Sequence, residues 1–122
     1  MKDTLRPGLT NTSTYQVTDQ MGPPHLDVAV LSTPWLLGLV EMTSLRAVRD
    51  HLDEHETTVG VGVRLTHDAA VRAGAEVTVT STLVAVEGRR LTFDAVVDGP
   101  SGTAGTVGLD SAVIDTRRFA RG

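Results

Sequence analysis

The chain has 122 residues, 40% of them hydrophobic, which suits a single domain over residues 1–122 with one core. Its formal net charge of −4, without a dense cluster of Lys or Arg, argues against a nucleic-acid-binding surface. The lack of cysteine excludes disulfides, thiolate zinc sites and Cys nucleophiles, and no other metal-ligating cluster stands out. No uncharged apolar run is long enough to span a bilayer, so we expect a soluble, cytoplasmic protein without a membrane partner.

The N-terminal quarter of the chain shows only weak structural signals. Residues 1–8 have the composition of a loose tail, and the Thr-rich residues 9–18 are predicted to form an edge strand. Residues 19–24, DQMGPP, are typical of a turn, and residues 25–32 connect this turn to the next element.

One long helix is predicted over residues 33–53, and the rest of the chain is expected to pack around it. Thr33 is suited to the N-cap position, and Pro34 is suited to the first helical position. Apolar residues recur at helical spacing and cover most of the first three turns, so the helix is expected to be mostly buried. Glu41 falls within this apolar stripe, one turn after Leu37. A carboxylate at a buried position needs a structural or functional explanation.

Four strands are predicted after the helix. Residues 58–67 alternate, and the predicted core-facing residues are Val59, Val61, Val63, Leu65 and His67. Strands are also predicted over residues 75–86, 91–97 and 103–116, separated by the short turns at 87–88 and 98–102. Because such turns join antiparallel neighbours, the fold class is predicted to be α+β, with an antiparallel five-stranded sheet around one long helix. A second subunit would protect a sheet edge, so a dimer is expected.

The helix and the first strand after it supply a candidate catalytic site. Glu41 and His67 both point inward in this prediction and can face the same cavity. A carboxylate beside an imidazole can perform acid–base or nucleophilic chemistry. Thr33, at the helix start, adds a hydroxyl and backbone N–H groups that suit a polarised carbonyl oxygen. The three groups together suit acyl transfer.

Each of these residues also has a purely structural explanation. Glu41 can be a buried carboxylate paired with an Arg, and His67 can be a core histidine bonded to backbone. Thr33 can be an N-cap without a further role. Gly60 can mark the close approach of a ligand or only of the helix, and Trp35 can line an acyl pocket or only pack.

The spacing of these residues forms a longer pattern. Glu41 follows Thr33 by eight residues and His67 follows Gly60 by seven, and VTVT at 77–80, VEGRRL at 86–91 and AVI at 112–114 come after them. Over about residues 29–119, this pattern resembles the hotdog-fold acyl-CoA thioesterases of the fluoroacetyl-CoA thioesterase type. The resemblance implies a hotdog fold, and a homodimer with two active sites at the subunit interface, without metal or bound cofactor. The family's catalytic Thr, Glu and His fall on Thr33, Glu41 and His67, and its substrate-binding Gly falls on Gly60.

Two departures from the family pattern concern the substrate. Ser111 occupies the position of an Arg on the last strand that helps to bind substrate in the fluoroacetyl-specific member. That member also has a longer lid with Phe residues before the helix, whereas residues 21–32 here are shorter and contain none. We therefore expect a small acyl thioester of CoA or of an acyl carrier protein, and we do not carry over the selectivity for fluoroacetyl.

The predicted function is that of an acyl-CoA thioesterase, a hydrolase that releases free acid and CoA. Glu41 attacks the thioester carbonyl or activates water, His67 orients and protonates, and Thr33 lies near the carbonyl oxygen. Two alternatives remain: a non-catalytic protein that binds acyl-CoA or another small ligand, and an enoyl-thioester hydratase or dehydratase. Release of free thiol and hydration of enoyl-CoA distinguish these three functions.

Overall fold

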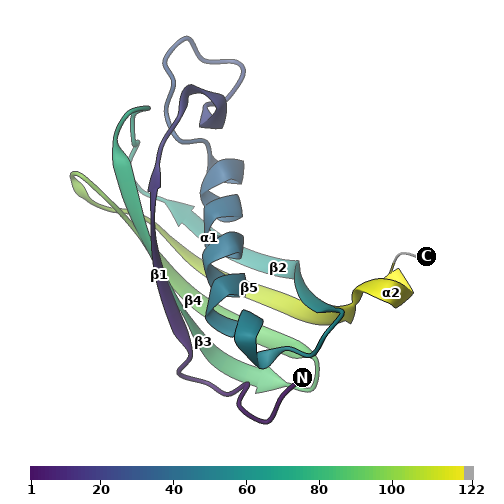
Figure 1. Cartoon of the computed structure of the whole chain (residues 1–122). Coiled ribbons are helices and arrows are strands. Elements are labelled where there is room, and N and C mark those ends of the chain that lie inside the picture. Colours follow the sequence, from purple (N-terminus) through teal and green to yellow (C-terminus); the bar gives the residue numbers. More distant parts are fainter. Residues whose placement is uncertain (120–122) are drawn as a thin grey trace.

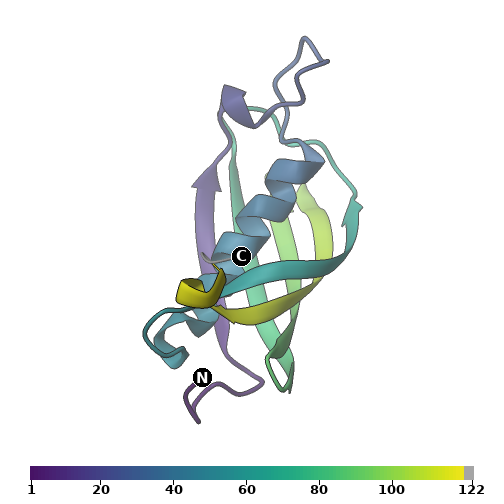
Figure 2. The same ribbon diagram turned by 90° about the vertical axis from the view of Figure 1, so that its right-hand side faces the viewer.

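A curved antiparallel sheet holds one long helix against its inner face (Figures 1 and 2). The computed structural model describes residues 1–119, so the last residues of the expected domain lie outside it. The elements are β1 (Thr10–Gln16), α1 (Thr33–Val48), β2 (Glu56–His67), β3 (Glu76–Glu87), β4 (Arg90–Gly99), β5 (Gly102–Asp115) and α2 (Thr116–Phe119). The five strands lie in the order β1-β3-β4-β5-β2, so β1 and β2 form the edges. The predicted α+β class and the edge position of the first strand are confirmed.

Helix α1 is capped by the residue before the predicted cap. Ser32 is extended, with φ −76° and ψ 156°, and its Oγ accepts the backbone N–H of Trp35 at 3.4 Å. The prediction of Thr33 as N-cap is therefore wrong. Thr33 is the first helical residue, which leaves its hydroxyl available to another partner. The regular helix ends at Val48 instead of residue 53, and a 3-10 turn, Arg49–His51, follows it.

The face of α1 that meets the sheet is apolar apart from two hydroxyl side chains. Its buried residues are Leu36, Leu39, Val40, Thr43, Ser44, Ala47 and Val48. Ser44 Oγ donates to the Val40 carbonyl at 2.7 Å and lies 2.7 Å from Ser81 Oγ of β3. The helix packs mainly on β3 and β1 and less on β2. The flank of the helix beside β2, which carries Leu37 and Glu41, is therefore only partly covered.

A β-bulge in β2 changes which of its residues face the helix. Gly60 and Gly62 pair with consecutive residues of β5, so Val61 is the extra residue on β2. Before the bulge, Val59 lies on the outer face instead of the predicted core-facing side. The uniform alternation predicted for residues 58–67 is therefore wrong in this part of the strand. The residues that face the helix are Thr58 and Gly60 before the bulge and Val63, Leu65 and His67 after it.

Residues 1–8 pack against the rest of the chain, so the prediction of a loose tail is wrong. Leu5 is 7% exposed and joins the hydrophobic core. The Lys2 N–H donates to the His51 carbonyl at 2.9 Å, and the Gly8 N–H donates to the Leu83 carbonyl at 2.8 Å. A buried side chain and backbone hydrogen bonds are the contacts that order a terminal segment. Among residues 1–119, no helix has the length and hydropathy needed to cross a membrane.

Candidate active site

Glu41 lies on the flank of α1 that faces β2, and its side chain is exposed instead of buried as predicted. A Cβ placed on Gly60 would lie 3.0 Å from Glu41 Oε2, so the carboxylate lies directly against the bare backbone of β2. Within residues 1–119, no Lys or Arg forms an ion pair with Glu41. The carboxylate is therefore not held by an Arg partner and is accessible to a ligand.

Thr33 and His67 meet at the N-terminal end of α1. Thr33 Oγ1 lies 2.8 Å from His67 Nδ1, so a hydrogen bond joins the hydroxyl to the ring. The other ring nitrogen, His67 Nε2, is buried and has no partner among the described residues. An unpaired buried polar atom costs free energy and is often found at a functional site. This contact depends on Ser32 being the cap, since the cap position would have used the Thr33 hydroxyl.

The structure does not bring Glu41 to the Thr33–His67 pair within one chain. The eight residues from Thr33 to Glu41 correspond to about 12 Å along an α-helix. Thr33 and His67 line a cavity of about 320 Å³ together with His25 and other residues of the segment before α1. Glu41 lines different cavities, so the predicted shared cavity of Glu41 and His67 is not present in the isolated chain.

Two cavities flank the Glu41 carboxylate, and both include Glu41 and Gly60. The cavity on the C-terminal side of Glu41, which we call the inner pocket, has a volume of about 160 Å³. The cavity on the N-terminal side, which we call the β2 groove, has a volume of about 240 Å³. The inner pocket is completed by Met42, Leu45, Thr58 and Ser111, and the β2 groove by residues that include Leu37, Val61, Val63 and Leu109.

Of the two predicted substrate-binding side chains, Ser111 lies beside Glu41 and Trp35 does not. Ser111 is 3% exposed, pairs with Gly60 across the strands and lines the inner pocket. Trp35 is 41% exposed and lines neither of the cavities at Glu41 nor the cavity at His67. Thr58 was missed by the sequence analysis because the bulge turns it inward. The two glycines on either side of Val61 were the available signal, since glycine in a strand often marks a bulge.

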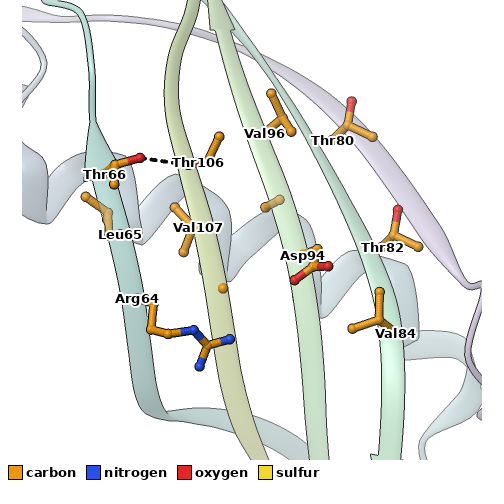
Figure 3. Close-up of a pocket in the computed structure, with 12 residues that line it drawn as sticks. Arg64, Leu65, Thr66, Thr80, Thr82, Val84, Asp94, Val96, Thr106 and Val107 are labelled. Carbon is orange, nitrogen blue, oxygen red and sulfur yellow. Dashed lines mark hydrogen bonds between the residues drawn. The ribbon is translucent and has the colours of Figure 1, made fainter.

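A large depression lies on the outer face of the sheet (Figure 3), and Glu41 does not line it. It has a volume of about 910 Å³ and is lined by Thr side chains, with Arg64 reaching across β5 toward Asp94. The hydroxyls of Thr66 and Thr106 lie 2.7 Å apart and bond to each other. None of the predicted site residues lines this depression. Within residues 1–119, no group of three or more His, Cys, Asp or Glu residues is arranged to hold a metal ion.

Comparisons with known proteins agree on one family and one fold. The family model described as fluoroacetyl-CoA-specific thioesterase matches residues 10–117. A fluoroacetyl-CoA thioesterase of Streptantibioticus cattleyicolor is 32% identical over 98% of this chain and 92% of its own. The crystal structure of a mutant fluoroacetyl-CoA-specific thioesterase is similar with a TM-score of 0.91 and 29% identity, over 98% of this chain and 96% of that one. A hot-dog-like protein from Thermanaerovibrio acidaminovorans has a TM-score of 0.85 at 23% identity, over 94% and 87% of the chains. The expected hotdog fold is confirmed.

Proposed function

We propose that this chain, which belongs to the fluoroacetyl-CoA-specific thioesterase family and is an acyl-CoA thioesterase, hydrolyses a small acyl thioester through Glu41, His67 and Thr33. The observation that carries these residue roles is the Glu41 carboxylate, which is exposed, lies against Gly60 and has cavities on both sides. CoA is part of the substrate, and the proposed hydrolysis needs no bound cofactor.

Glu41 is the group that attacks the substrate in this proposal. Its carboxylate adds to the thioester carbonyl carbon, the C–S bond breaks, and CoA leaves as a thiolate that takes up a proton. Water then cleaves the resulting acyl anhydride, which releases the free acid and restores the carboxylate. In the other form of the mechanism, Glu41 removes a proton from a water molecule that attacks the carbonyl directly. Both forms give the same products.

The Thr33–His67 pair handles the proton and the carbonyl oxygen. The hydrogen bond between Thr33 Oγ1 and His67 Nδ1 fixes the orientation of the ring and leaves Nε2 for the substrate. His67 can then orient the reacting group and protonate the leaving thiolate. The first turn of α1 lies beside this pair, so its positive end favours the charge that develops on the oxygen.

A second copy of the chain completes the site in this proposal. Glu41 and His67 line separate cavities of one chain, so a site with all three residues needs groups from two protomers. Strand β2 is a sheet edge and exposes Val61 and Val63, which are 51% and 47% exposed, beside Glu41. Contact between two copies at this edge would cover these side chains. We therefore propose a homodimer; the sequence leaves a larger assembly open, and a cytoplasmic location stays a prediction from it.

Thiol release from acetyl-CoA and butyryl-CoA tests the roles of the three residues. We expect Glu41→Gln and His67→Ala to lower kcat by at least about 10²-fold, because each removes a group that acts on the reacting atoms. Thr33→Val is expected to lower kcat by about tenfold, because the ring then loses its orienting hydrogen bond. Asp94→Asn, on the outer face, is the control and should keep the wild-type rate. Wild-type rates in correctly folded Glu41→Gln and His67→Ala would remove both residues from the chemistry.

Mixing the two inactive variants tests whether the site is shared between protomers. If Glu41 and His67 come from different chains, each mixed dimer has one intact site and one site with both substitutions. After co-refolding of equal amounts of Glu41→Gln and His67→Ala, about one quarter of the wild-type activity should return, since about half of the dimers are mixed. No recovery in a preparation shown to contain mixed dimers would place both residues of each site on one chain.

A further inference from the structure

The inner pocket and the β2 groove meet at the Glu41 carboxylate, and they differ in size and chemistry. Besides its oxygen, a thioester carbonyl carbon carries two substituents, the acyl chain and the sulfur of the thiol arm. A carbonyl carbon at Glu41 has one cavity on each side, so each substituent can enter a different cavity. The two cavities share the wall formed by Glu41 and Gly60, so the position of the carbonyl decides the direction of both substituents.

The smaller cavity suits the acyl group better than the thiol arm. The thiol arm of CoA is longer than a short acyl chain and needs the larger of the two cavities, which is the β2 groove between Leu37 of α1 and strand β2. The inner pocket, with a volume of about 160 Å³, is the smaller of the two cavities at Glu41. We therefore expect it to favour a short acyl chain over a long one.

Two hydroxyl side chains give the inner pocket a polar side. Ser111 of β5 is opposite Gly60, and Thr58 is two residues before Gly60 on the same inner face of β2. Within residues 1–119, neither hydroxyl is hydrogen-bonded to another side chain, in contrast to the paired Thr residues of the outer face. The opposite side of the pocket is apolar and comes from Met42 and Leu45 of α1.

We propose that the inner pocket binds the acyl group and selects short acyl chains that carry a hydroxyl or carbonyl group, with Ser111 and Thr58 as the specificity-determining residues. This inference rests on the proposed thioesterase function and adds the class of substrate to it. The apolar wall contacts the carbon chain, and the hydroxyls of Ser111 and Thr58 bond to its polar substituent. A site that hydrogen-bonds a substrate hydroxyl discriminates against the analogue that lacks it.

The test compares butyryl-CoA, 3-hydroxybutyryl-CoA and octanoyl-CoA by thiol release. The wild type should prefer the hydroxylated substrate to butyryl-CoA and cleave octanoyl-CoA least. Ser111→Ala and Thr58→Val remove one hydroxyl each with little change of volume, and each should lower the preference for 3-hydroxybutyryl-CoA about three- to tenfold. Ser111→Leu fills part of the pocket and should lower activity on butyryl-CoA more than activity on acetyl-CoA. Thr80→Val, on the outer face of β3, is the matched control and should keep the wild-type preference.

A binding measurement separates failure of this inference from failure of the proposed function. The affinities of Glu41→Gln for 3-hydroxybutyryl-CoA and butyryl-CoA are measured by calorimetry, with and without Ser111→Ala. If the wild type releases no thiol but the hydroxylated ligand binds more tightly through Ser111, the thioesterase function is wrong and the pocket assignment holds. The pocket assignment is overturned if the wild-type order of substrates and ligands is kept in all three variants, Ser111→Ala, Thr58→Val and Ser111→Leu. It is also overturned if no acyl-CoA binds. The melting temperature of each variant shows whether it is folded.

Discussion

The contact between Glu41 and Gly60 predicts that Gly60→Ala lowers activity with almost no loss of stability. The added Cβ would lie 3.0 Å from Glu41 Oε2 and 3.5 Å from Glu41 Cδ. Because an ordinary contact begins near 3.4 Å, the carboxylate must retreat by about 0.4 Å. A displacement of about 1 Å can cost about 10²-fold in rate, so a shift of about 0.4 Å corresponds to a loss of about five- to tenfold.

The expected stability of Gly60→Ala follows from the surroundings of the same contact. Glu41 is exposed and flexible, so it can move aside at little cost. The new methyl group also lies 3.6 Å from Leu109 Cδ1, which is an ordinary contact. Gly60 does not have a positive φ, so alanine introduces no backbone strain there. The free energy of unfolding should therefore change by less than about 1 kcal/mol, which corresponds to a few degrees in Tm.

Gly62→Ala is the matched control for this prediction. Its Cβ would meet Asp110 Oδ2 at 3.5 Å, an ordinary contact on the other face of β2. Steady-state thiol release and thermal unfolding are measured for both variants. Unchanged kcat in Gly60→Ala, beside a strong loss in Glu41→Gln, would refute the idea that this contact positions the acid. Equal losses in both glycine variants would assign the effect to the bulge instead of the carboxylate.

Three further predictions concern stability. Ser44→Ala and Ser81→Ala should each lower the free energy of unfolding by about 1 kcal/mol. In urea denaturation, the double variant should lose less free energy of unfolding than the two single variants lose together. Strictly additive losses would contradict a stabilising hydrogen bond between Ser44 and Ser81. Ser32→Ala should lower the free energy of unfolding by about 0.5–1 kcal/mol through loss of the cap, and an unchanged Tm would show that the 3.4 Å contact is not stabilising. The Thr92 hydroxyl, the largest cause, holds the pKa of Asp110 below its ordinary 3.8, so Thr92→Val should raise this pKa in an NMR titration. The stability that the lowered pKa provides is present above pH 3.8 and is lost as the pH falls. The free energy of unfolding of the wild type and of Thr92→Val should therefore differ less in acid than at neutral pH.

The order of elements was predictable from the sequence because apolar and polar residues alternate along the strands and the turns between them contain residues typical of turns. The N-cap of α1 was placed one residue too late, at Thr33 instead of Ser32, since the two residues are adjacent and both favour the cap position. The burial of Glu41 was predicted wrongly for a different reason. The first turns of α1 are apolar on almost every side, so periodicity does not show which flank the sheet covers. That choice depends on the helix packing toward β1 and β3, which is a tertiary effect.

The candidate site was predictable where the strand is regular and was missed where it is not. His67 was placed correctly on the inner face because it follows the bulge and keeps the alternation of the second half of β2. Thr58 precedes the bulge, so the insertion of Val61 reverses its face. A one-residue shift reverses every side chain of a strand segment, and alternation alone does not locate such a shift.

Gly60 and Ser111 pair across β2 and β5. The pair separates two requirements that many enzymes place on one residue, which are to position the acid and to shape the cavity beside it. On β2, a Cβ at position 60 would press on the Glu41 carboxylate, so the proposed role of Glu41 leaves that position almost no freedom to vary. Its cross-strand neighbour on β5 touches the same cavity without restricting the acid in this way. Random libraries at Ser111 would therefore be the natural starting point for directed evolution of new acyl preferences, because they change the proposed acyl pocket while Gly60 stays in place beside Glu41.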